Sequence, residues 1–323
     1  MSGQCLLPKY QERHHDYVLG PNQDARLASV AAGAEITNIE LQLDPDAPFE
    51  LRSRCVRQAY TQSLTQNGLQ FLKTKWTGPL RGVFRQQDYV LESLQMAYFG
   101  QVGNSKPIRP SITYPANGIL SLNLVNTGAS ALTNVTFFWR GVKLFPWGAV
   151  PAYRYPAAMK SSPFSYPVPI INLGPTERRT SLIFQPGMNN ATGAAKPDSD
   201  FVLRAGQATP PFGSGEGGTR RQFAEVGIRL YDWSKKPFSN DFVPLDIFFG
   251  GGSFPAAFPL GQTPSFISPF GTGPAQPGLF YPEIYIPRLN QLLYDLQRTD
   301  GAVNGNVNES FVINWIAQKV FPQ

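Results

Sequence analysis

Few residues of this chain could take part in catalysis or metal binding, and the two histidines among them lie side by side. His14 and His15 stand in a polar stretch near the start, and no other histidine follows. Histidine is the common ligand of catalytic metals and the common base of nucleophilic triads. Adjacent histidines on an extended segment are typical of a solvated tail. We therefore expect neither a histidine-ligated metal nor a triad.

Two close pairs of aspartates are the remaining candidates for acid–base or cation chemistry. Asp44 and Asp46 precede one apolar stretch, and Asp198 and Asp200 precede a similar one later in the chain. Paired carboxylates serve glycoside hydrolysis, and carboxylate oxygens bind calcium. Asp and Pro directly before a strand also form turns. We favour turns over calcium binding and catalysis, and we expect no enzyme activity and no cofactor.

Basic and aromatic side chains could serve binding instead. The arginines and lysines form short scattered clusters, whereas a nucleic-acid groove needs one basic stripe with interleaved aromatics, so nucleic acid is not an expected partner. Four tryptophans recur at equivalent places of two halves: Trp76, Trp139, Trp233 and Trp315. Because each keeps its register with apolar neighbours, we expect core positions. Exposed platforms for sugar stacking are the alternative.

The sequence segments that are expected to form the secondary structure around these residues occur twice in the chain. Residues 110–127 match residues 282–299 without a gap, and residues 139–146 match residues 315–322. Shorter matches join residues 49–52 to 201–204 and Leu-Gly-Pro at residues 19–21 to residues 173–175. Matches of this length and order indicate a tandem duplication.

The repeated segments have the pattern of strands. Residues 36–43 alternate apolar and polar side chains, as a half-buried strand does. Residues 289–298 resemble a helix in isolation, but their repeat partner alternates leucines after Asn117-Gly118, so they are expected to be a strand. The chain contains 30 Gly and 30 Pro, which favours turns. The predicted fold is all-β, with two tandem jelly-roll-like β-sandwiches and an extended N-terminal arm.

The predicted organisation has four parts. Residues 1–30 form the arm, 31–146 the first sandwich, 147–169 a linker rich in Pro and aromatics, and 170–323 the second sandwich. The second sandwich carries a Gly/Pro/Phe-rich insertion at about residues 250–280. Apolar side chains in such a segment are expected to be buried against a neighbouring subunit or to fold back over the sheet. The candidate subunit contacts are Phe254, Phe258, Phe266, Phe270, Tyr153 and Tyr155.

The composition of the chain limits the cellular settings and partners to be expected. No apolar run is long enough to span a membrane, and no signal peptide is visible, so no membrane partner is expected. Cys5 and Cys55 could pair, but two thiols in 323 residues fit a chain made in a reducing cytoplasm. We expect free thiols.

The chain resembles virion structural proteins of bacteriophages over about residues 35–146 and 170–322. The resemblance rests on PDSDFVLRAG, RLYDWSKKPFSNDFVPLDIFFG, FYPEIYIPRLNQLLYDLQRTD, and YPANGILSLNLVN followed by FFWRGVKLFP. It implies a non-enzymatic virion protein made in the bacterial host cytoplasm. No functional residue carries over.

Three roles follow from this resemblance. The first is a head-associated decoration protein, minor capsid protein or portal-vertex and collar adaptor, with capsid, portal or collar subunits as partners and a homo-oligomer or symmetric array on the particle. The second is a double-jelly-roll major capsid protein, of which three chains form a pseudo-hexameric capsomer. The third is a carbohydrate- or receptor-binding tail module, which predicts exposed Trp or Tyr.

Overall fold

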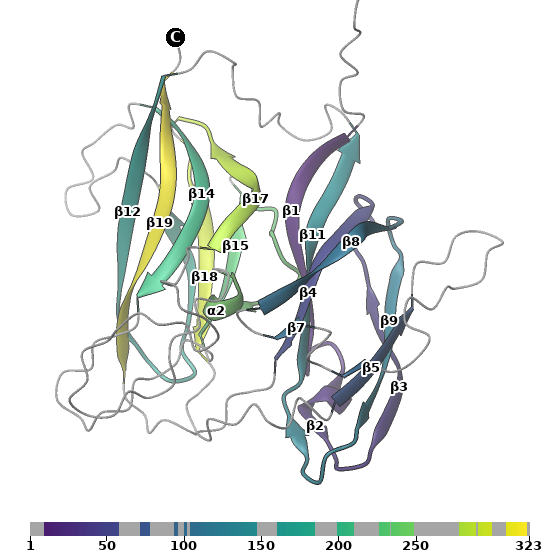
Figure 1. The fold of residues 1–323 in the computed structure, drawn as a ribbon. Coiled ribbons are helices and arrows are strands. Elements are labelled where there is room, and N and C mark those ends of the chain that lie inside the picture. The colour runs from purple at the N-terminus through teal and green to yellow at the C-terminus, as the bar shows by residue number, and fades with distance from the viewer. Residues whose placement is uncertain are drawn as a thin grey trace, which may run out of the picture.

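The computed structural model describes residues 10–57, 72–77, 94–95, 100–101, 104–146, 160–184, 199–209, 226–232, 234–248, 278–288, 290–298 and 308–321. Within these ranges the chain is built mainly of antiparallel strands, which form two β-sandwiches lying side by side (Figure 1). The predicted fold class, all-β with tandem sandwiches, is confirmed.

The first sandwich has two main sheets, with strand orders β1-β11-β4-β7-β8 and β3-β9-β5-β6. Their bounds are β1 (Tyr10–Leu19), β3 (Glu35–Gln42), β4 (Phe49–Arg57), β5 (Leu72–Thr77), β6 (Leu94–Gln95), β7 (Gly100–Gln101), β8 (Asn104–Tyr114), β9 (Ile119–Asn126) and β11 (Thr136–Pro146). A further two-stranded sheet pairs β2 (Ser29–Val30) with β10 (Leu132–Thr133), and a 3-10 turn (η1) spans Ala25–Ala28.

The second sandwich has the sheet orders β12-β19-β14-β17 and β13-β18-β15-β16. Their bounds are β12 (Lys160–Leu173), β13 (Arg178–Phe184), β14 (Asp200–Thr209), β15 (Val226–Tyr231), β16 (Val243–Pro244), β17 (Gly278–Ile286), β18 (Leu292–Arg298) and β19 (Glu309–Phe321). One turn of helix, α2 (Leu245–Phe248), follows β16. No helix in the described ranges is both long and apolar enough to cross a membrane.

The two sandwiches have the same topology. The short strands β2, β7 and β10 have no counterpart among the described residues of the second sandwich. When they are set aside and the equally short β6 and β16 are kept, each sandwich has eight strands in chain order. One sheet then has the order 1-8-3-6 and the other 2-7-4-5 in both sandwiches. This is the strand order of a jelly roll.

The register between strands is also the same. Phe49 lies opposite Tyr114, and its repeat partner Phe201 lies opposite Ile286. The pairing of β4 with β11 skips Arg52, and the pairing of β14 with β19 skips Arg204 at the matching position. A shared β-bulge is a specific feature of a strand pair. The duplication itself stays an interpretation of the sequence repeat.

Alternating side chains of the matched strands build the two cores. In β9, Leu120, Leu122 and Leu124 are buried, and their partners in β18 are the buried Leu292, Tyr294 and Leu296. The prediction that the second segment is a strand is therefore confirmed. Trp139 and Trp315 are fully buried, as predicted, while the side chain of Trp76 and the whole of Trp233 lie outside what is described.

The predicted N-terminal arm is wrong for residues 10–30. Tyr10–Leu19 forms β1, which pairs with β11 along all its 10 residues. Its charged side chains made it look solvated, but His14 and His15 are only 2% and 1% exposed. His14 is on the face of this strand that the second sandwich covers, whereas His15 is buried on the other face, against Tyr17 and Phe49 of the first sandwich.

The predicted linker is also too long. Residues 160–169, assigned to it from their prolines, belong to β12, an edge strand paired with β19. Prolines are tolerated in edge strands because the outward side of the strand needs no backbone donor. The first sandwich therefore starts at Tyr10 and the second at Lys160.

Gly141 provides a test of the shared bulge. A Cβ added there would lie 2.0 Å from the carbonyl oxygen of Glu50, whereas the equivalent position of the second sandwich holds Ala317. We expect Gly141→Ala to lower the free energy of unfolding by about 1–3 kcal/mol through overpacking. The reciprocal control, Ala317→Gly, should cost only about 0.5–1 kcal/mol. Urea denaturation measures both, and a Gly141→Ala protein as stable as the parent would contradict this packing.

Candidate functional site at the junction of the two sandwiches

Strand β1 belongs to both sandwiches. Successive side chains of a strand point to opposite faces. Tyr17 and Leu19 pack in the core of the first sandwich, whereas Val18 packs in the core of the second. Phe138, opposite Val18 on β11, joins the second core as well. The two sandwiches are thus joined by continuous apolar packing.

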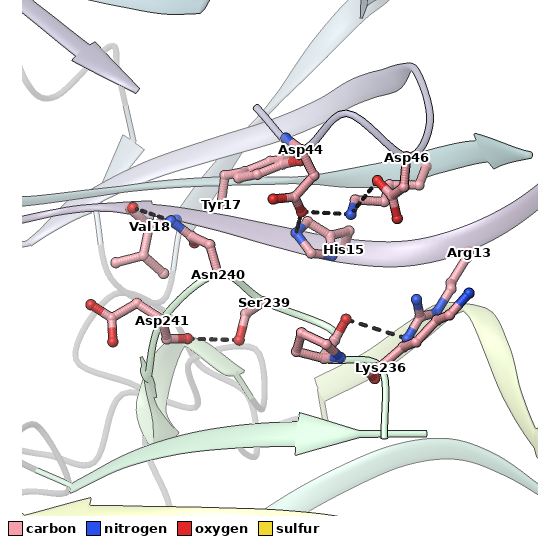
Figure 2. Close-up of polar contacts among 12 residues, drawn as sticks. Arg13, His15, Tyr17, Val18, Asp44, Asp46, Lys236, Ser239, Asn240 and Asp241 are labelled. Carbon is pink, nitrogen blue, oxygen red and sulfur yellow. Dashed lines mark hydrogen bonds and ion pairs between the residues drawn. The ribbon is translucent and has the colours of Figure 1, made fainter. Parts of the chain in front are cut away.

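The free edge of β1 is hydrogen-bonded by the segment of residues 232–241, which connects β15 to β16. The Asp16 N–H donates to the Phe238 carbonyl at 2.9 Å. The Val18 N–H donates to Asn240 Oδ1 at 2.7 Å, and Asn240 Nδ2 donates to the Val18 carbonyl at 2.9 Å (Figure 2). These bonds satisfy edge groups that would otherwise need water.

Arg13 anchors the same segment. Its Nη2 lies 3.0 Å from Asp232 Oδ2 and donates to the Lys236 carbonyl at 2.8 Å, the contact drawn in Figure 2. The guanidinium also stacks over the Phe238 ring, 4.6 Å from its centroid. Asp232 is held in turn by the backbone N–H groups of Ser234 and Lys236. Several bonds thus fix one arginine that is almost fully buried.

Asp16 forms the central ion pair of the junction. Arg140 donates to its two oxygens from Nε and Nη2, each at 2.9 Å, and His14 Nε2 lies 3.4 Å away. Burial alone would raise the pKa of Asp16, but Arg140 and His14 hold it well below its usual range. Arg140 also donates to the Phe248 carbonyl at the end of α2. The pair therefore connects β1, β11 and the second sandwich.

A second polar cluster lies at the other face of β1. Lys143 Nζ lies 2.6 Å from Asp44 Oδ2 and 2.8 Å from Asp46 Oδ1, and the Asp44 N–H donates to Tyr17 Oη (Figure 2). The two aspartates do lie in the turn before β4, as predicted. No spacing in the sequence indicates their buried partner, Lys143.

His15 is buried beside this cluster. Its Nε2 lies 3.5 Å from Asp44 Oδ2, a long contact to a carboxylate that Lys143 already neutralises. Its ring packs edge-on against Tyr17, with 4.5 Å between centroids. Burial first, and then the charges of Lys143 and Arg13, lower the pKa of His15 well below its ordinary value. The ring is therefore neutral at pH 7.

The arrangement is suited to holding two domains together. Each charged group of the junction faces an opposite charge or a backbone partner, and most are buried. Across the ranges that the structure describes, no group of three or more His, Cys, Asp or Glu could hold a metal ion. The contacts of this site are of the kind that hold two domains together.

The predicted subunit contacts stay predictions. Phe254, Phe258, Phe266, Phe270, Tyr153 and Tyr155 all lie outside the described residues, as does Cys5. The backbone of Cys55 is in β4, but its side chain is not among those described. The prediction of free thiols therefore stays a prediction.

Comparisons with known proteins add little. No family model matches the chain, and no curated protein matches its sequence. The solved structures that align include three of very low similarity. One, titled as the structure of infectious bursal disease virus Gx strain, has a TM-score of 0.22 and 9% identity over 99% of this chain and 74% of that one.

The second is PNGase F, a glycosylasparaginase from Flavobacterium meningosepticum, with a TM-score of 0.20 and 10% identity over 92% and 90% of the two chains. The third is the tandem CBM22 domain of Xyn10C from Paenibacillus barcinonensis, with a TM-score of 0.18 and 10% identity over 99% and 100%. TM-scores this low carry no information on the fold or function of this chain.

Proposed function

We propose that this chain is a non-enzymatic virion structural protein of a bacteriophage, and specifically a major capsid protein of the double-jelly-roll type. The observation that carries the proposal is the pair of complete jelly rolls with one strand order, joined in one chain over a buried junction. Jelly rolls recur in viral capsids, and this step is an analogy at the level of fold. The phage assignment rests on the resemblance of the sequence.

The geometry of the junction supports this role. The first sandwich uses its β1 side, whereas the second uses the β16–β17 side, through residues 232–241, α2 and β17. Two like modules that meet through different surfaces form a head-to-tail contact, which can repeat until a ring closes. Three chains supply six modules, the number that a hexagonal capsid lattice requires.

The decoration or adaptor role is supported less well. It relied partly on an arm that would order only on the particle, and β1 already occupies that stretch within the sheet. The tail-module alternative needs exposed aromatic platforms, but Trp139 and Trp315 are buried. Jelly rolls that act as metal enzymes need histidine clusters, and the two histidines of this chain are adjacent in β1.

Light scattering of the purified chain on a sizing column tests the proposal. The chain has a mass of 35.6 kDa, so a trimer should elute with a mass of about 107 kDa. We expect this mass to hold across a tenfold dilution in the micromolar range. A single-chain mass at the highest concentration would overturn the proposal.

A further inference from the structure

The junction uses an edge strand of the first sandwich, whereas the equivalent edge strand of the second sandwich takes no part in it. In the first sandwich the edge strand β1 is covered by the second sandwich. The strand with the same place in the second sandwich is β12, at the edge of the sheet β12-β19-β14-β17. In Figure 1 this strand lies on the side of the second sandwich that faces away from the first. The described part of this chain therefore leaves β12 uncovered.

The register shows which residues of β12 correspond to the junction residues of β1. Tyr17 pairs with Trp139, and Tyr166 pairs with the equivalent Trp315. Counting along the strands, His14, Asp16 and Val18 correspond to Pro163, Ser165 and Pro167. The side chains that the second sandwich covers on β1 are thus matched by an outward row on β12.

This outward row of β12 is apolar except at Ser165. Pro163, Pro167 and Pro169 are exposed, whereas the intervening Val168 and Ile170 are buried. Ile171 continues the alternation and is 61% exposed. Beside the row, the half-buried side chains of β19 alternate in character. Val312 and Ile316 lie opposite Pro169 and Ser165, and the polar Asn314 and Gln318 lie opposite Pro167 and Pro163. An exposed apolar row of this kind is typical of an interaction surface.

The prolines also determine the kind of contact. The N–H of Val18 donates to the neighbouring sandwich, but proline at the equivalent Pro167 has no N–H. Prolines along an edge prevent another strand from pairing with it. A partner must therefore bind this row through side-chain packing rather than by extending the sheet.

We propose that the outer row of β12, formed by Pro163, Pro167, Pro169 and Ile171, binds the first sandwich of a second copy of this chain. The inference rests on the proposed capsid function. In the described part of the chain, the sheet edges of that first sandwich at the ends opposite β1 and β3 are β6 and β8, the equivalents of β16 and β17. Each chain thus offers one β12 side and one β6–β8 side. Three head-to-tail contacts between chains would alternate with three junctions within chains and close a six-module ring.

One substitution and a matched control test this surface. Ile171→Arg places a charge in the row, and because this side chain is already largely exposed, the single chain should fold normally. Ile183→Arg is the control, since Ile183 is 49% exposed but lies on β13 of the other sheet. Circular dichroism and thermal melting verify that both variants fold.

We expect Ile171→Arg to reduce the light-scattering mass about threefold, from about 107 kDa to the single-chain 35.6 kDa, at low micromolar concentration. The parent and Ile183→Arg should keep the larger mass. If the parent is a trimer and both variants or neither dissociate, the β12 surface is wrong while the capsid proposal stands. A parent that is itself a single chain overturns both.

Discussion

Replacing Asp16 with alanine should lower the free energy of unfolding by about 3 kcal/mol, because it removes one partner of a buried ion pair. Asp16 is 2% exposed and accepts two hydrogen bonds from Arg140. Without the carboxylate, the Arg140 guanidinium stays at the junction with its charge uncompensated. Denaturation with guanidinium chloride, followed by tryptophan fluorescence, measures the loss in the free energy of unfolding.

A surface pair provides the control for Asp16. Arg204 and Glu283 also lie 3.0 Å apart, but their side chains are 48% and 32% exposed. Exposed pairs contribute about 0–1 kcal/mol, so Glu283→Ala should change stability by less than about 1 kcal/mol. Equal losses in the two variants would mean that the junction pair is not buried as described.

The second large effect is a loss of stability on acidification that depends on His15. Burial, followed by the charges of Lys143 and Arg13, and then by His14, lowers the pKa of His15, while Asp16 raises it. In the unfolded chain the pKa returns to about 6.5. Below this pH the unfolded state binds a proton that the folded state does not. Stability should therefore be constant above pH 6.5 with respect to this group and should fall as the pH drops below it.

The slope gives the size of this effect. One proton corresponds to about 1.4 kcal/mol of unfolding free energy per pH unit in the window just below pH 6.5. His15→Phe keeps the edge-on ring contact with Tyr17 and removes the titrating group. We expect the slope of stability against pH in this window to be smaller by about one proton in the variant. Equal slopes in the two proteins would contradict a neutral buried His15.

Much of the fold could be predicted from sequence because the strand patterns of the first half recur in the second half. Leu120, Leu122 and Leu124 repeat as Leu292, Tyr294 and Leu296, and both sets are buried with the same register to their neighbours. A repeat removes the ambiguity of a short apolar run, since both copies must fit one structure. This is why the strand at Leu292–Arg298 was distinguished from a helix.

The arm expected at the start of the chain is wrong because both faces of this strand are buried, one by its own sandwich and the other by the second sandwich. The stretch of Tyr10–Leu19 carries five charged or histidine side chains in sequence, which in isolation indicates a solvated segment. A signal was nevertheless present. Leu19-Gly20-Pro21 repeats as Leu173-Gly174-Pro175, and in both copies the glycine N–H donates to the side chain three residues later. What precedes the motif in one copy should therefore be a strand in the other.

The junction itself could not be derived from the repeat. Arg13 and Asp16 have no charged equivalents on β12, and their partners Asp232 and Arg140 are distant in sequence. Interfaces between duplicated modules are where the two copies must differ, because one module uses a surface that the other leaves free. Only the arrangement of the two sandwiches brings these residues together.

The most direct test of the capsid assignment is electron microscopy of the purified protein, with averaged images viewed along the symmetry axis. We predict closed rings of six similar lobes with three-fold symmetry, in which two kinds of contact alternate around the ring. Particles with only two lobes, or open filaments of varying length, would contradict the assignment of this chain as a double-jelly-roll capsid subunit.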